Sequence, residues 1–177
     1  MNKPDSISVF QAASTPNRNA LSLPQASHDF DFLMGNWIVR NRRLRERLKG
    51  CQEWDEFDAT STARPLLRGV GNEDEFVTDY AGGFVGMSFR FLNLSTGQWV
   101  IFWADSRRGT LEPPVTGCFS NNIGIFSGAD TLEGRAILVR YIWSQVDAPA
   151  PRWEQAFSGD GGLTWETNWT MEFCRAA

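Results

Sequence analysis

From about residue 29 onward, apolar and polar positions alternate in short segments separated by turn residues. The clearest segment places Trp165, Thr167, Trp169, Met171 and Phe173 on one face and polar residues on the other. Because successive side chains of a strand point to opposite faces, this alternation predicts a strand with one dry and one wet face. About ten strands are predicted in this way, at 36–48, 52–66, 73–80, 84–93, 98–105, 115–120, 123–128, 135–144, 152–158 and 165–174.

The segments between these strands favour hairpins. Gly82-Gly83 and Asn121-Asn122 supply residues that accept positive φ, a glycine ends the short loop 95–97, and residues 130–134 predict a longer loop. A sheet that is wet on one side, with no helices to cover the other, must become a sandwich or a closed barrel, and a sandwich needs long crossovers. We therefore predict an all-β fold, a single up-and-down antiparallel β-barrel of about ten strands over residues 29–177.

Residues 1–28 are rich in Ser, Pro, Asn and Gln, which predicts a flexible N-terminal leader with one turn of helix near residues 9–13. The leader lacks the apolar stretch of a signal peptide, and the three cysteines are widely spaced. Together these features predict reduced thiols and a cytoplasmic location. A chain of 177 residues is expected to form one domain around one core.

Charge argues against two classes of partner. The net charge is -4, so neither nucleic acid nor an anionic membrane is expected to bind without a local basic patch. The one basic run, residues 40–49, is followed directly by the acidic run 53–58. We expect the two runs to pair with each other on adjacent strands, and we predict no nucleic-acid and no membrane partner.

The chain has one histidine, His28, and it precedes the first predicted strand. A histidine there cannot ligate haem or zinc from a late strand, and it cannot be the base of a Ser-His-Asp or Cys-His arrangement. We therefore expect no metal and no cofactor.

The stretch Gly35-Asn36-Trp37 resembles the Gly-x-Trp of the calycins, the superfamily of lipocalins, fatty-acid-binding proteins, avidins and nitrobindins. Residues 30–37 together with 153–169 look like a family of uncharacterised bacterial calycin-like proteins, over about residues 29–175. The resemblance implies a lipocalin-like barrel in which Trp37 plugs the closed end and a basic residue of the last strand packs across its ring. Arg175 is the matching candidate, so Gly35, Trp37 and Arg175 are assigned to the barrel floor.

A second motif, Ser158-Gly-Asp-Gly-Gly-Leu-Thr-Trp165, matches the Asp box that is repeated in sialidase-type propellers. A propeller needs several copies and a longer chain. We therefore interpret this motif as a hairpin turn.

In a calycin-like barrel the ligand lies in a cup, so the inward side chains are the candidate site. The predicted inner sets include Met87, Phe89 and Phe91 on one strand and Trp99, Ile101, Trp103 and Asp105 on the next. On strand 135–144 either Val139, Tyr141 and Trp143 or Leu138, Arg140 and Ile142 face inward. The ligand-binding candidates are Phe89, Phe91, Trp103, Arg90, Arg140, Tyr141, Trp143, Trp153 and Trp169.

These residues predict binding of a small apolar or aromatic molecule without covalent chemistry, with any anionic group met by Arg90 or Arg140. Both arginines could equally face outward and pair with surface carboxylates. One alternative is an isomerase or lyase that uses Asp105, Arg140, Tyr141 and Glu154, with the loop at 103–115 as a lid. Another is a barrel filled by its own rings, with a structural or protein-binding role. The aromatic surplus also suggests a homodimer. A perturbed carboxylate beside Arg140 or Tyr141 in an open cup would favour the enzyme.

Overall fold

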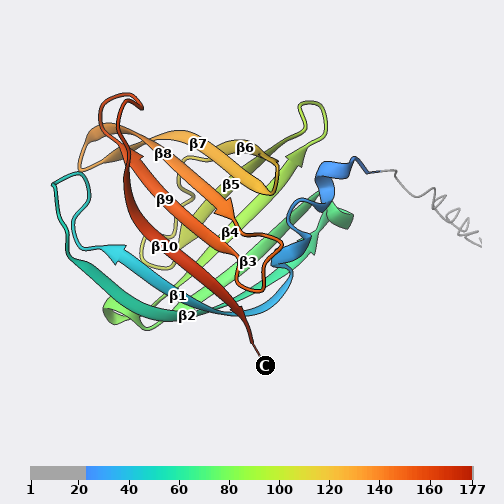
Figure 1. Cartoon of the computed structure of the whole chain (residues 1–177), viewed down its shortest axis with the longest axis horizontal. Coiled ribbons are helices and arrows are strands. Elements are labelled where there is room, and N and C mark those ends of the chain that lie inside the picture. The colour runs from blue at the N-terminus through green and yellow to red at the C-terminus, as the bar shows by residue number, and fades with distance from the viewer. Residues whose placement is uncertain (1–22, 177) are drawn as a thin grey trace, which may run out of the picture.

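The computed structural model, which describes residues 23–176, forms a closed barrel of antiparallel strands (Figure 1). Each strand pairs with its neighbours in sequence, and the last strand closes the barrel against the first. The all-β up-and-down prediction is confirmed. The strands are β1 (Gly35–Leu44), β2 (Trp54–Leu66), β3 (Gly71–Thr78), β4 (Phe84–Asn93), β5 (Gln98–Asp105), β6 (Val115–Ser120), β7 (Ile123–Leu132), β8 (Arg135–Ser144), β9 (Arg152–Ser158) and β10 (Glu166–Arg175).

Most predicted strand ends lie within two residues of the observed ones, and two ends, those of β1 and β7, were wrong by four residues. β1 ends at Leu44 instead of continuing to residue 48. β7 runs to Leu132, because Glu133 and Gly134 both take positive φ and make a two-residue turn where a longer loop was predicted. The Asn121-Asn122 turn has the predicted positive φ at both residues.

The basic and acidic runs pair as predicted. β1 and β2 are antiparallel, and Arg42 lies opposite Glu56 with its Nε 3.0 Å from a carboxylate oxygen. Beyond the end of β1, Arg45 contacts both Glu53 and Asp55 at 2.7 Å. These exposed pairs hold the long β1–β2 connection in place, each with a contribution of about 0.2–1 kcal/mol.

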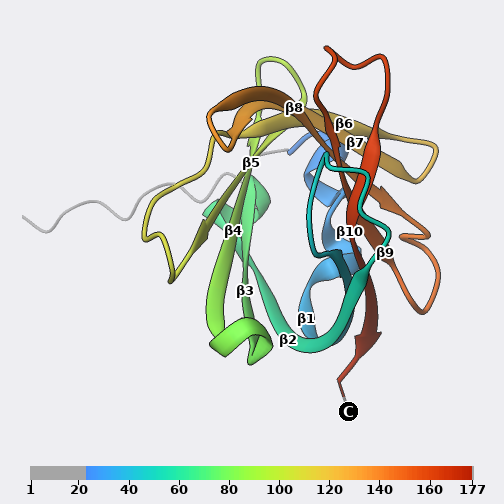
Figure 2. The ribbon, with the colours of Figure 1, turned by 90° about the vertical axis from the view of Figure 1, so that its left-hand side faces the viewer.

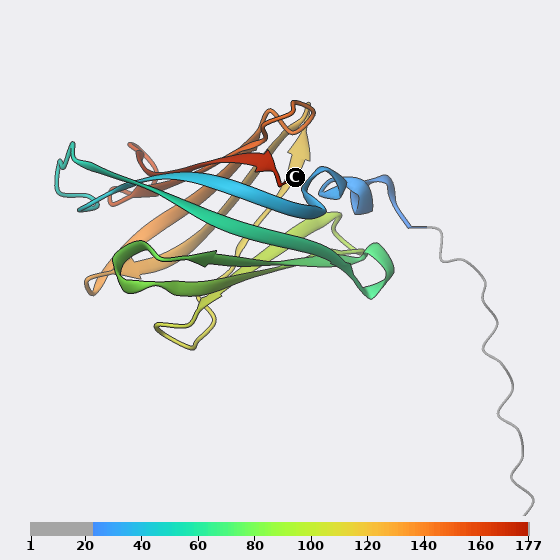
Figure 3. The same cartoon turned by 90° about the horizontal axis from the view of Figure 1, so that it is seen from below.

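Short helices close one end of the barrel. The 3-10 helices η1 (Gln25–His28) and η2 (Asp31–Leu33) lie across this end, away from the β1–β2 connection (Figures 1 and 3). Between them Phe30, which is 1% exposed, packs edge-on against Trp99 and Phe119. Residues 25–28, assigned to the leader by sequence, therefore form a helix here, whereas the helical turn predicted near residues 9–13 lies outside the described residues.

The barrel floor has the expected contact between the first and last strands. The Arg175 guanidinium lies 3.8 Å from the ring centre of Trp37 and donates hydrogen bonds to the backbone carbonyls of Met34 and Phe32. Gly35 has a φ of 110°, and a Cβ there would lie 2.8 Å from the Arg175 guanidinium. Only glycine fits this conformation and this close approach without strain.

The Asp-box motif forms the β9–β10 turn, as predicted. The Asp160 carboxylate accepts hydrogen bonds from the Thr164 backbone and hydroxyl, and the Ser158 hydroxyl accepts one from Gly162 N–H. The Thr164 hydroxyl, followed by the Thr164 backbone N–H, holds the pKa of Asp160 well below its usual range. The motif thus has a local structural role.

The 3-10 helix η3 (Leu67–Gly69) connects β2 to β3 at the floor end. The 3-10 helix η4 (Tyr80–Gly82) connects β3 to β4 at the opposite end of the barrel. Figure 2 views the barrel from the end that carries the β1–β2 connection and shows the strands as a ring. None of the helices in residues 23–176 has the length and apolar character needed to cross a membrane.

Candidate ligand-binding cup

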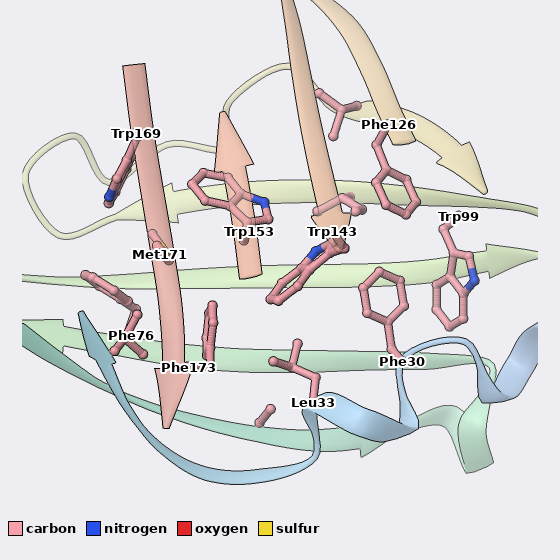
Figure 4. Packing of buried hydrophobic residues seen from close by; sticks show 14 of the residues in the cluster. Phe30, Leu33, Phe76, Trp99, Phe126, Trp143, Trp153, Trp169, Met171 and Phe173 are labelled. Atoms are coloured by element: carbon pink, nitrogen blue, oxygen red, sulfur yellow. The ribbon is translucent and has the colours of Figure 1, made fainter. Parts of the chain in front are cut away.

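The interior is filled near the floor and open toward the opposite end. A cavity of about 320 Å³ lies inside the ring of strands, on the side away from Phe30 and Trp99. Figure 4 shows Trp153, Trp169 and Phe76 at that end of the core and Phe30 and Trp99 at the other. We call this cavity and its lining the cup. Its apolar wall includes Phe76, Phe84, Trp103, Trp143, Trp153 and Trp169.

The Trp169 ring is the centre of the apolar wall. It meets Trp153 edge to face at 5.7 Å and Trp103 at 6.4 Å between ring centres. Its indole N–H donates a hydrogen bond to the Asn41 side chain at 3.0 Å, and Asn41 in turn donates to the Val39 carbonyl. The ring is therefore held in one orientation before any ligand arrives, which lowers the cost of ordering the site on binding.

A buried ion pair forms part of the cup wall. Arg90, 4% exposed, donates hydrogen bonds to Asp74 at 2.5 Å and to Asn72 at 3.0 Å. Asp74 neutralises the guanidinium, which is the condition for placing an arginine inside a barrel. Its Nε is buried without a hydrogen-bond partner among the described residues.

Tyr141 supplies a neutral hydrogen-bond donor. Its ring packs 5.0 Å from Trp153 and lines the cup. Burial, followed by the charges of Glu112 and Asp130, raises the pKa of the Tyr141 hydroxyl well above its usual value. The phenol therefore keeps its proton at physiological pH and can donate it to a ligand oxygen.

Charged residues surround the open end of the cup. This region, which we call the mouth, contains Arg43, Arg47, Arg107, Arg108, Asp105, Glu112 and Asp130. Arg108 pairs with Glu112 at 2.7 Å. The Asp105 carboxylate accepts hydrogen bonds from the backbone N–H groups of residues 107 and 108, each at 2.9 Å. Burial raises the pKa of Glu112 above its usual value, and the Arg108 charge opposes this increase.

Two mouth arginines are held by contacts that leave their charge unbalanced. Arg107 donates hydrogen bonds to the carbonyls of Tyr80 and Ala81, and its guanidinium lies 4.6 Å from the Phe84 ring. Arg43 lies with its guanidinium 4.4 Å from the Trp169 ring, and its Nε is buried without a hydrogen-bond partner in residues 23–176.

Several predicted site residues do not line the cup, and the facing of β4 was predicted wrongly. Phe89 and Phe91 alternate with Ser88 and Arg90, and it is the latter pair that faces inward. At Gly86 the inner face of β4 carries no side chain, because the Trp103 ring lies against the backbone there and any Cβ would overlap it. Met87, Phe89 and Phe91 therefore occupy the outer face, half-buried.

Arg140 and Glu154 also lie outside the cup. The Arg140 guanidinium stacks 4.1 Å from the Trp165 ring on the outer face. Trp165 and Thr167 were predicted to share the dry face of Trp169, and this was wrong because a register shift between Thr167 and Trp169 turns them outward. Glu154 pairs with Arg152 at 3.3 Å. On β8 the inner set is therefore Val139, Tyr141 and Trp143, and the predicted anion contact at Arg140 is ruled out by its position.

The structure brings together the other candidates, namely Arg90, Trp103, Asp105, Tyr141, Trp143, Trp153 and Trp169. Sequence reasoning missed Arg43, Arg47, Arg107 and Glu112. A signal existed for Arg43, because it is in phase with Trp37, Val39 and Asn41 along β1, all of which are buried. For the loop residues 107 and 112 no periodic signal was present.

Within residues 23–176, no group of three or more His, Cys, Asp or Glu side chains is arranged to hold a metal ion. The three cysteines Cys51, Cys118 and Cys174 are free thiols.

The fold and the cavity define the class of protein as a closed up-and-down β-barrel with an aromatic cup and a charged mouth. Comparison of the chain with models of known protein families and with curated protein sequences gave no match.

Proposed function

We propose that this protein is a calycin-like barrel that binds a small aromatic or apolar molecule in its cup, without covalent chemistry. The observation that carries the proposal is the cavity of about 320 Å³ that remains beside the interior side chains, open to solvent at the mouth. A barrel filled by its own rings would leave no such space. Ligand sites typically have volumes of about 300–1,000 Å³ and apolar linings with a few polar groups. A volume at the lower end favours a compact ligand.

The wall suits a flat molecule. Trp103, Trp153 and Trp169 offer both faces and edges to the cavity, and aromatic pairs in such arrangements contribute about 0.5–1.5 kcal/mol beyond burial of area. The Tyr141 hydroxyl adds one donor that can orient a polar substituent.

The test is native mass spectrometry of the protein purified from its own host, compared with the denatured mass. We expect one extra mass per chain that is lost on denaturation. The matched control is Ser88→Phe, which places a ring in the cup from a buried position on β4, with folding checked by circular dichroism. The bare mass alone, or an extra mass that persists in a folded Ser88→Phe variant, would contradict the proposal.

One observation favours a second candidate, proton transfer in the same cup. Glu112 lines the cup with a pKa raised by burial, and its charge acts on Tyr141. Its carboxylate could take a proton from the carbon next to a ketone while the Tyr141 hydroxyl donates a hydrogen bond to the oxygen that gains charge. Deuterium exchange into 2-tetralone in D₂O, followed by NMR, checks this. Exchange no faster than in Glu112→Gln would rule it out.

A cytoplasmic location and a homodimer remain predictions, which cell fractionation and size-exclusion chromatography with light scattering would check.

A further inference from the structure

Among the residues that the structure describes, Arg43 is a partly buried cation without a carboxylate partner. It lies on the inner face of β1 opposite Trp169 of β10, and its guanidinium covers the Trp169 ring at 4.4 Å. Its Nε is buried without a hydrogen-bond partner, and it forms no salt bridge with any carboxylate of residues 23–176. Burial lowers the pKa of Arg43 to about 10, and the charge of Arg47 adds to this. Arg43 therefore remains charged at neutral pH, in an environment that disfavours the charge.

The lining as a whole carries one excess positive charge, although the chain carries a net charge of -4. Five arginines face four carboxylates around the cavity. They are Arg43, Arg47, Arg90, Arg107 and Arg108 against Asp74, Asp105, Glu112 and Asp130. Arg90 and Arg108 have direct carboxylate partners, so the imbalance lies with the other three arginines.

The sequence assigned a ligand anion to Arg90 or Arg140, and neither position suits one. Arg90 is already neutralised by Asp74 at 2.5 Å, so an added anion would meet that carboxylate. Arg140 is on the outer face. Arg43 is the cup arginine that combines burial, an unused donor and lack of a counter-ion.

We propose that the ligand is an aromatic carboxylate whose anionic group binds the Arg43 guanidinium at the mouth, with Arg47 and Arg107 nearby, while its ring lies among Trp103, Trp153 and Trp169. This inference rests on the proposed binding function and gives the chemical class of the ligand. One negative charge on the ligand balances the excess positive charge of the lining, whereas a second would be repelled by the carboxylates of the mouth. The planar guanidinium matches a carboxylate in geometry, and Arg43 already lies on the ring wall, so one ligand can reach both.

The test compares naphthalene-2-carboxylate with its neutral isostere naphthalene-2-carboxamide by isothermal titration calorimetry at fixed salt. In the wild-type chain we expect the carboxylate to bind about 10-fold or more tightly than the amide, as for a charge-assisted hydrogen bond. Arg43→Gln should remove this preference and leave amide affinity within about 3-fold. The control is Arg42→Gln, which removes the same charge from the outer face, where Arg42 pairs with Glu56, and should keep the preference.

The outcomes separate the two proposals. Equal binding of both probes to the wild-type chain overturns the carboxylate inference and leaves the aromatic cup in place. Binding of neither probe overturns both. A preference that survives in Arg43→Gln also overturns the inference. If Arg43→Gln does not fold, Arg43→Lys replaces it: this variant keeps the charge but loses the two-pronged geometry, and an undiminished carboxylate preference there would equally contradict the assignment.

Discussion

Truncation of Phe30 is expected to destabilise the barrel strongly, although sequence places this residue at the junction with the leader. Phe30 is 1% exposed and lies against five aromatic rings, of which the nearest are Trp99, Phe119 and Phe126 at centre distances of 4.9, 5.1 and 5.9 Å. Loss of its buried surface costs about 1.5–3 kcal/mol, and the cavity left in a rigid barrel end raises the total for Phe30→Ala to about 3–5 kcal/mol.

Urea unfolding followed by circular dichroism measures this change as a lower free energy of unfolding. Phe102→Ala is the matched control, because Phe102 is only half-buried and lies opposite Phe89 on the outer face. We expect it to lose less than half as much. A loss below about 1 kcal/mol for Phe30→Ala would refute the view that the N-terminal segment forms part of the core.

Three further predictions concern the floor, the wall and the mouth. Arg175→Met removes a guanidinium from the Trp37 ring and two hydrogen bonds to backbone carbonyls, so the free energy of unfolding in urea should fall by about 1–2 kcal/mol. An unchanged urea midpoint of unfolding would contradict the assignment of Arg175 to the barrel floor. Gly86→Ala should displace the Trp103 ring, lower the free energy of unfolding by about 1–3 kcal/mol and weaken the affinity for naphthalene-2-carboxamide measured by calorimetry. An unchanged affinity would show that the ligand does not contact this wall of the cup. Because the pKa of Arg43 is lowered to about 10, the affinity for naphthalene-2-carboxylate should be full below that pH and should decline as the pH rises through it. The affinity for naphthalene-2-carboxamide should stay level. An equal decline for both probes, while circular dichroism reports a folded chain, would argue against Arg43 as the anion site.

The strand order, most turns and the floor contact were predictable because each depends on local signals. Alternation marks the strands, and Asn121-Asn122 and the Asp-box loop carry their own turn chemistry. The pairing of Trp37 with Arg175 followed from the motif at one end of the chain and the phase of the last strand at the other.

The facing of β4 was not predictable from hydrophobicity, because two other side chains decide it. Gly86 leaves room for Trp103, and Asp74 of β3 neutralises Arg90, so the apolar Phe89 remains on the outer face. Such compensation appears only when neighbouring strands are in register.

The mouth was not predictable for a related reason. Arg43 and Arg107 are far apart in sequence, and they face one cavity only because β1 and β5 end at the same end of a closed barrel. Burial of Arg43 depends on Trp169 from a third strand. No local pattern carries this arrangement.

The central claim, that the cup is a ligand site, is tested most directly by a crystal structure of the chain grown with 6-bromonaphthalene-2-carboxylate, with anomalous scattering used to locate the bromine. We predict a bromine peak inside the barrel near Trp103, Trp153 and Trp169, with the carboxylate at Arg43. A bromine peak confined to the outer face at Phe89 and Phe102, or no peak at saturating ligand concentration, would contradict the account.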